Sequence, residues 1–189
     1  CCMDQIISFI EKSKDRYLRE LTDLLAIPSI STNPENKQDI NRCADWVAAH
    51  LKIIGMQNVE IMPTAGHPVV YADWVGAPGK PTVLFYGHYD VQPVDPLNLW
   101  TSPPFQATIR GDNLFARGSA DDKGQIFIHF KSVEAYLKNT GTLPVNLKMI
   151  IEGEEEIGSE HLDAFVREHK TLLKADLVVI SDTSMFAKG

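Results

Sequence analysis

The chain has 189 residues, of which 44% are hydrophobic and 23% charged, so it is long enough to bury the core of one globular domain. Its formal net charge of -7 without any basic run argues against nucleic acid as a partner, and no stretch approaches the ~20 apolar residues of a membrane span. The three cysteines do not form a disulfide framework, so we expect a reducing compartment, the cytoplasm.

Two amphipathic helices are predicted at the start of the chain. Apolar residues recur at helical spacing from residue 4 to residue 26. A second helix is predicted at about 35–54, with Asn33 as its cap and Gly55 as its stop. Cys43 falls on the apolar face of this helix, where we expect a buried free thiol.

Beyond residue 57 the pattern changes to strands that alternate with helices. The predicted strands cover residues 58–62, 69–75, 82–86, 145–151 and 176–181, and the predicted helices cover about 123–138 and 159–169. This alternation indicates a three-layer α/β domain with a largely parallel central sheet.

A long connection spans residues 88–117 and carries several Pro and Asp residues. Connections of this length in compact domains are usually functional. Trp100 lies in it, and we expect this ring to pack within the loop, with a place in the core as the alternative.

Three of the predicted strands end in residues that can bind metal ions. These strand ends are Gly87-His88-Tyr89-Asp90, Glu152-Gly153-Glu154-Glu155-Glu156 and Ser181-Asp182. Asp121 and Asp122 open the helix predicted from about residue 123, and helix N-termini favour acids. Ligand sites in open α/β sheets lie at the carboxyl edge of the strands, so one imidazole and several carboxylates should meet there.

Each of these features has an ordinary structural interpretation when it is taken alone. His88 could be a simple strand-end histidine, the glutamate run a solvated turn, and Asp121 with Asp122 a helix cap. Together, however, so many carboxylates stay ionised side by side only if cations neutralise them. Histidine with carboxylates suits Zn²⁺, with Mn²⁺ or Co²⁺ as substitutes, and a bridging carboxylate would give a two-metal hydrolytic site.

The motifs that carry these residues resemble those of a known family. They are Gly87-His88-Tyr89-Asp90-Val91-Gln92-Pro93, Arg117-Gly118-Ser119-Ala120-Asp121-Asp122-Lys123-Gly124 and Glu152-Gly153-Glu154-Glu155-Glu156-Ile157-Gly158-Ser159. In this order they resemble the co-catalytic zinc metallopeptidases that include carnosinase-type dipeptidases, aminoacylase, carboxypeptidase G, acetylornithine deacetylase and succinyl-diaminopimelate desuccinylase. The resemblance covers nearly the whole chain and implies a three-layer α/β/α zinc-peptidase-like catalytic domain.

The resemblance also implies a set of metal ligands. His88 and Asp182 would bind one divalent ion, Glu156 would bind the other, and Asp121 would bridge both. A cis peptide bond is implied between Asp121 and Asp122.

The resemblance further implies the catalytic roles. Asp90 would orient the imidazole of His88, and Glu155 would be the general base. Lys123 is expected to pair with nearby acids and to take no part in the chemistry.

A part of the family's fold has no counterpart among these motifs. The family's second ion also takes a histidine from the C-terminal part of the fold, and no remaining histidine here lies in a motif that matches it. We therefore predict that residues 1–189 are the N-terminal part of the catalytic metallopeptidase domain, without the lid or dimerisation domain and the C-terminal catalytic segment. The full-length form is expected to be a homodimer.

The predicted function is hydrolysis of dipeptides or small peptides by a metal-activated water, with a glutamate as the general base. An N-acyl amino acid deacylase or deacetylase is one alternative, because it shares the same motifs. A truncated metal-binding fragment without turnover is the other.

Overall fold

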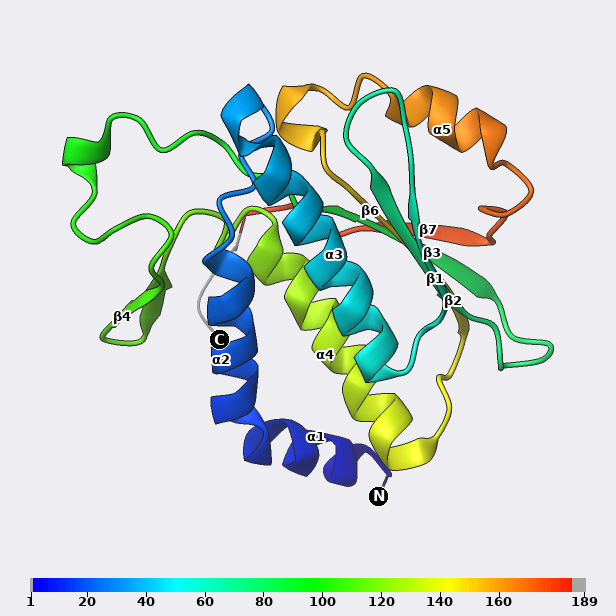
Figure 1. Ribbon diagram of the computed structural model, residues 1–189. Helices are drawn as coiled ribbons and strands as arrows, with labels where there is room; N and C mark the ends of the chain where they lie inside the picture. Colours follow the sequence, from blue (N-terminus) through cyan, green and yellow to red (C-terminus); the bar gives the residue numbers. More distant parts are fainter. Residues whose placement is uncertain (1, 185–189) are drawn as a thin grey trace.

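A mixed five-stranded sheet forms the centre of the domain (Figure 1). The computed structural model describes residues 2–184 of the chain. Across the sheet the strand order is β1-β2-β6-β3-β7. The strands are β1 (Gln57–Met62), β2 (Val69–Trp74), β3 (Thr82–His88), β6 (Asn146–Glu152) and β7 (Leu177–Ile180).

The direction of the strands confirms the predicted α/β sheet, with one difference. β6, β3 and β7 are parallel neighbours, as expected. β2 is antiparallel to both of its neighbours, β1 and β6, so the sheet is mixed. The short connection between β1 and β2 explains this reversal, because a hairpin joins antiparallel strands whereas parallel neighbours need a longer crossover.

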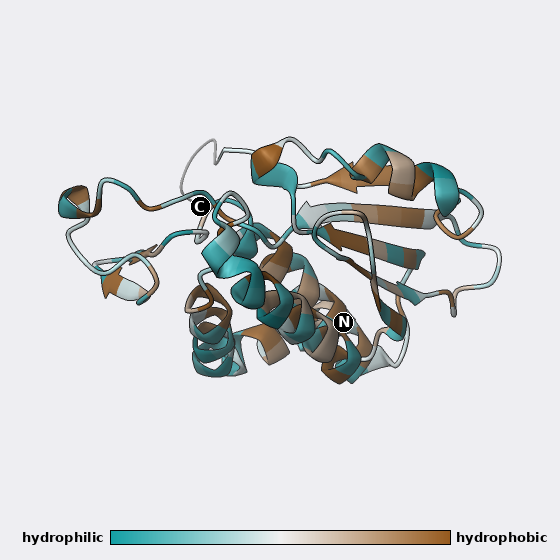
Figure 2. Cartoon of the chain, turned by 45° about the horizontal axis from the view of Figure 1, so that its top comes forward, coloured by the Kyte–Doolittle hydropathy of each residue, from teal (hydrophilic) through white to brown (hydrophobic). Residues whose placement is uncertain are grey.

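Helices cover both faces of the sheet and make it the middle of three layers (Figure 1). One face is covered by α1 (Cys2–Lys12), α2 (Lys14–Leu25), α3 (Lys37–Ile54) and α4 (Lys123–Thr140). The other face packs against α5 (Leu162–Glu168), with Phe165 in a smaller apolar cluster. The helices carry both hydrophilic and hydrophobic residues (Figure 2), as expected for helices that bury only one side.

The single helix predicted for residues 4–26 is wrong. α1 ends at Lys12 and α2 begins at Lys14, with Ser13 between them. Both helices pack against α4, but α1 crosses its C-terminal end while α2 lies along it (Figure 1). The change of direction is therefore imposed by packing against α4, which the local periodicity cannot report.

Three other predicted helices hold with shifted boundaries. Asn33 caps a short 3-10 turn (Pro34–Asn36) by accepting the Glu35 N–H, and α3 starts only after it. Gly55 ends α3 with a φ of 105°, as predicted. The helix predicted for 159–169 is shorter. After the 3-10 turn η3 (Glu155–Ile157), Gly158 and Ser159 have positive φ values of 94° and 52°, and α5 begins only at Leu162.

The long connection after β3 has structure of its own. It contains the turn η2 (Leu97–Leu99) and a small hairpin of β4 (Thr108–Arg110) and β5 (Asn113–Phe115), which the sequence prediction missed. It extends away from the sheet (Figure 1). Trp100 packs within this loop, as expected, with its ring N–H donating to Val94 O at 2.8 Å.

Two further expectations are met in the described part of the chain. Cys43 is a free and fully buried thiol. Among residues 2–184, every helix is too short or too polar to cross a membrane.

Candidate metal centre

The candidate metal centre lies at the carboxyl edge of the three parallel strands. β6, β3 and β7 are neighbours in the sheet, and His88 at the end of β3 is in register with Glu152 at the end of β6. Asp182 follows the end of β7 by two residues, and Asp121 lies just before α4. The topology therefore brings together residues that are far apart in the sequence.

His88 is at the centre of this group. Its Nε2 lies 3.1 Å from Asp121 Oδ1, 3.7 Å from Asp182 Oδ2 and 3.9 Å from Glu155 Oε2. His88, Asp121 and Asp182 each offer a ligand atom, and these atoms lie within 4.8 Å of one another. His88 is buried, while the Asp121 side chain is 62% exposed, so the group opens towards solvent.

Asp90 is fully buried and contacts two parts of the site at once. Its Oδ1 lies 3.3 Å from Nδ1 of His88, and its backbone oxygen lies 3.0 Å from the same nitrogen. The same carboxylate accepts the backbone N–H groups of Glu155 at 3.2 Å and Glu156 at 3.1 Å. The sequence reasoning expected the first contact and missed the second, which joins strand ends that are more than 60 residues apart.

The two glutamates of η3 have different surroundings. The Glu155 side chain faces His88, whereas Glu156 Oε2 accepts a hydrogen bond from the Gln92 amide at 2.6 Å. Burial raises the pKa of Glu155, and Asp182 adds to this effect, although His88 opposes it. Burial also raises the pKa of Glu156, with Asp121 contributing. Gln92 lies in the same motif as His88 and Asp90, but the sequence predicted no role for it.

The electrostatics of the group favour a cation. Burial lowers the pKa of His88, but the surrounding carboxylates, Asp90 first, outweigh burial and raise that pKa to about 10. Burial also raises the pKa of Asp122 to about 7, with Asp182 and Asp121 contributing. Positive charge is thus stabilised and a further negative charge is disfavoured, so the donor set fits a divalent ion.

The backbone at Asp121 agrees with the expectation taken from the family. The peptide bond between Asp121 and Asp122 is cis, as predicted. Asp122 itself is buried, and its Oδ2 accepts the backbone N–H of His88 at 3.1 Å.

The expected pairing of Lys123 with nearby acids is wrong. Its ammonium is fully buried and donates to the carbonyl oxygens of Leu24 at 3.2 Å and Ile27 at 2.6 Å. Leu24 lies in the last turn of α2, which ends at Leu25, and Ile27 follows this end by two residues. Lys123 therefore ties α2 to the start of α4.

The other histidines of the described chain lie in different surroundings. His50 stacks on Trp46 with a ring separation of 4.5 Å, His129 lies 4.3 Å from the Phe85 ring and His169 lies 4.6 Å from the Phe165 ring. Among the described residues, the metal-capable group contains His88 as its one histidine.

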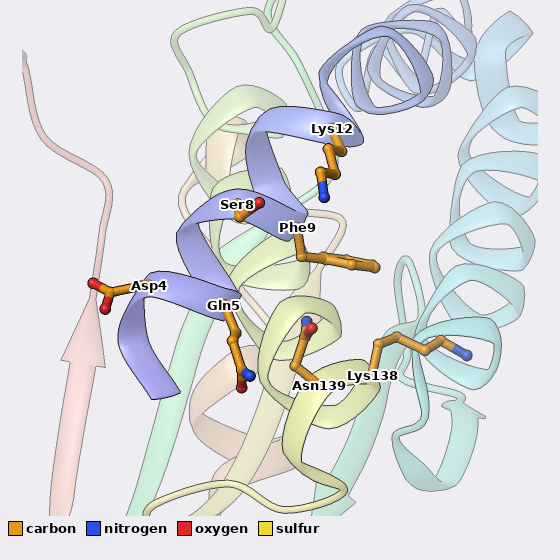
Figure 3. Close-up of a pocket in the computed structure, with 7 residues that line it drawn as sticks. All are labelled: Asp4, Gln5, Ser8, Phe9, Lys12, Lys138 and Asn139. Carbon is orange, nitrogen blue, oxygen red and sulfur yellow. The ribbon is translucent and has the colours of Figure 1, made fainter. Parts of the chain in front are cut away.

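A hollow elsewhere on the surface lacks such a ligand set. It lies between α1 and the end of α4 (Figure 3), and its lining includes Asp4, Phe9, Lys12 and Lys138. One carboxylate beside two lysines does not suit a metal ion, so the sheet edge remains the candidate site.

Curated proteins resemble this chain over nearly its whole length. It is 33% identical over 193 residues to the Cys-Gly metallodipeptidase dug1 of Schizosaccharomyces pombe. The matched region covers 96% of this chain and 40% of that protein. The chain is 32% identical over 194 residues to the Beta-Ala-His dipeptidase of Homo sapiens, which covers 95% of this chain and 38% of that protein. The chain thus spans about two fifths of the length of these relatives.

Solved structures and a family profile lead to the same family. The crystal structure of human carnosine dipeptidase 1 matches with a TM-score of 0.91 and 32% identity, covering 100% of this chain and 42% of that chain. A profile described as peptidase family M20/M25/M40 matches residues 84–189, which is more than half of the chain. The resemblance found in the motifs is therefore confirmed, and the chain belongs to peptidase family M20/M25/M40.

Proposed function

We propose that this chain supplies most of the site of a two-metal dipeptidase, with Zn²⁺ as the ion and Mn²⁺ or Co²⁺ as substitutes. The observation that carries the proposal is the convergence of His88, Asp121 and Asp182 at one sheet edge. The names of the relatives, which refer to Cys-Gly and Beta-Ala-His, support a dipeptide as the substrate.

In this proposal the ligands divide between two ions. His88 and Asp182 would hold the first ion, Glu156 would hold the second, and Asp121 would serve both. This chain would then supply three ligands to the first ion and two to the second. Catalytic zinc usually has three protein ligands and a water, so the second ion needs one more ligand from outside this chain.

Two divalent ions at this edge would lower the pKa of a water towards ~7 and polarise a carbonyl group. Glu155 then takes a proton from the attacking water and returns it to the leaving amine. Asp90 keeps the His88 ring in one orientation while this happens.

The domain organisation belongs to the same proposal. We infer that residues 1–189 act as the N-terminal part of a catalytic domain, completed by a C-terminal segment and by a lid domain through which two copies associate. The coverage of about 40% of the relatives supports this inference. The buried free thiol of Cys43 fits the cytoplasm as the compartment.

The test combines metal binding with turnover. Zn²⁺ is titrated into the metal-free 189-residue chain, and hydrolysis of Cys-Gly, of β-Ala-His and of an N-acetyl amino acid is assayed with this chain and with the full-length protein. The proposal expects dipeptide hydrolysis that needs metal. Cleavage of only the N-acetyl substrate would establish the deacylase instead, and a metal-loaded full-length protein without turnover would refute a peptidase.

A further inference from the structure

Glu154 is a buried carboxylate that the proposed reaction does not use. It directly precedes Glu155 and Glu156, yet its side chain is turned towards the body of the domain and the residue is only 4% exposed. Its Oε1 accepts the backbone N–H of His67 at 2.9 Å, and its Oε2 lies 2.9 Å from Nδ1 of His161. A buried carboxylate is costly unless it is partnered, so this arrangement is built around Glu154.

The backbone of Glu154 holds the turn that carries the two catalytic glutamates. Its carbonyl oxygen accepts the N–H of Ile157 at 3.2 Å and that of Ser159 at 2.8 Å. Glu154 is thus the N-cap residue of η3, anchored by its side chain on one side and by its carbonyl on the other. The turn has a second anchor in Asp90, which accepts the N–H groups of Glu155 and Glu156.

The partner of Glu154 is itself well held. The Thr64 hydroxyl donates to His67 O at 2.7 Å and accepts the Gly66 N–H at 3.0 Å. Nε2 of the His67 ring lies 3.3 Å from the backbone oxygen of Ser31. This contact connects the loop between β1 and β2 to the segment before α3. The connection between β1 and β2 therefore offers a fixed N–H to the carboxylate.

Gly66 shows how closely the carboxylate fits against this connection. A Cβ atom at Gly66 would lie 1.6 Å from Glu154 Oε1 and 2.7 Å from Nδ1 of His161. Any larger residue at position 66 would have to displace the carboxylate. The position of Glu154 can thus be disturbed without changing Glu154 itself.

We propose that Glu154 is a positioning residue, which holds the turn of Glu155 and Glu156 against the connection between β1 and β2, with His161 as its side-chain partner. The inference rests on the proposed function, because that function makes Glu155 the base and Glu156 a ligand of the second ion. Glu154 acts through the turn and touches neither substrate nor metal.

The test compares four variants of the chain. Glu154→Ala removes the anchor, and Gly66→Ala displaces it. Glu154→Gln keeps an oxygen for the His67 N–H and an amide that can donate to the His161 ring. Glu160→Gln removes an exposed carboxylate from the same stretch and is the matched control.

The first measurement is amide hydrogen exchange in the metal-free chain, followed by NMR. We expect exchange at the Glu155 and Glu156 amides to rise about tenfold or more in Glu154→Ala and Gly66→Ala, the scale of one lost hydrogen bond. Glu154→Gln should restore most of the protection, and Glu160→Gln should not change it. Unchanged exchange at these two amides in Glu154→Ala would overturn the proposal, as would an equal rise throughout β3 and β6.

The second measurement is Zn²⁺ affinity. Loss of a group that orients ligands typically weakens metal binding by about 10–100-fold. We expect this loss for the ion bound by Glu156, with the ion at His88 and Asp182 unchanged, and equal weakening of both ions would contradict a local role. Absence of dipeptide hydrolysis by the unaltered full-length protein would refute the proposed function instead, because the exchange measurement needs neither metal nor substrate.

Discussion

The central strands β3 and β6 and the edge strand β7 end at the same site, but they are held very differently. Ile151 near the end of β6 is fully buried, whereas Ile180 at the end of β7 is 62% exposed. β6 pairs with β2 and β3, while in the described chain β7 pairs only with β3. The side chains of the two proposed ligands differ in the same way: that of His88 is fully buried, and that of Asp182 is 26% exposed.

This difference separates a preorganised half of the site from a weakly supported half. His88 is fixed by Asp90 and by the neighbouring strands, so it needs little rearrangement to bind an ion. Asp182 depends on a strand whose residues are all exposed. We expect changes in the centre to affect both folding and chemistry, and changes at the edge to affect mainly the binding of the first ion.

The largest expected effect is on stability. Ile151→Ala deletes buried side-chain carbons from the core and should lower the free energy of unfolding by about 2–5 kcal/mol. Ile180→Ala makes the same change at an exposed site and should lower it by less than about 0.5 kcal/mol. Urea denaturation of both variants measures the difference, and equal losses would mean that β7 is as well supported as β6.

The second effect concerns Glu155, the proposed general base on the central side. Glu155→Gln keeps the shape of the side chain but cannot accept a proton, so kcat in the full-length protein should fall at least ~10²-fold. Metal content, measured by atomic emission, should barely change. Loss of metal in this variant would mean that the roles of Glu155 and Glu156 are exchanged.

The third effect contrasts the two halves directly. Asp90→Ala removes the partner of His88 and the acceptor for the turn of Glu155 and Glu156, so both ions should bind about 10–100-fold more weakly. Asp182→Ala should weaken only the first ion. Isothermal titration with Zn²⁺ checks both, and a loss of both ions in Asp182→Ala would show that the edge organises the whole site.

A fourth prediction concerns the two ions in the unaltered 189-residue chain. In the proposed arrangement this chain supplies three ligands to the first ion and two to the second, so the second should bind at least about tenfold more weakly. Hydrolysis by this chain should be poor. Two equally tight ions with full activity would mean that another residue of this chain, such as His161 or His169, supplies the ligand that we propose to come from outside it.

The smallest expected effect is on association. In the described sheet β7 is an edge strand, and all of its residues are apolar and exposed, which favours pairing with another copy. Val178→Lys should reduce self-association at tens of micromolar without lowering the melting temperature. Analytical ultracentrifugation tests this, and an unchanged distribution of species would place the association elsewhere.

Much of the fold could be read from local patterns. Helical spacing of apolar residues located α3, and apolar runs of strand length located β3 and β6, each to within a few residues. The helix predicted at about 123–138 corresponds to α4. The order of the motifs, together with the tendency of ligand sites to lie at the carboxyl ends of parallel strands, predicted which residues meet at the sheet edge. That reasoning works because parallel neighbouring strands end at the same edge wherever the chain runs between them.

Other features were decided only by tertiary contacts. Packing of α1 across the end of α4 broke the first predicted helix at Ser13. The ammonium of Lys123 donates to the carbonyls of Leu24, in the last turn of α2, and of Ile27, just beyond it. The Glu154 carboxylate accepts the N–H of His67, which lies 87 residues away in the sequence. Sequence alone predicted the chemical groups of the candidate site. The contacts by which one residue orients another, such as Asp90 with His88, depend on distances between segments that local propensity does not encode.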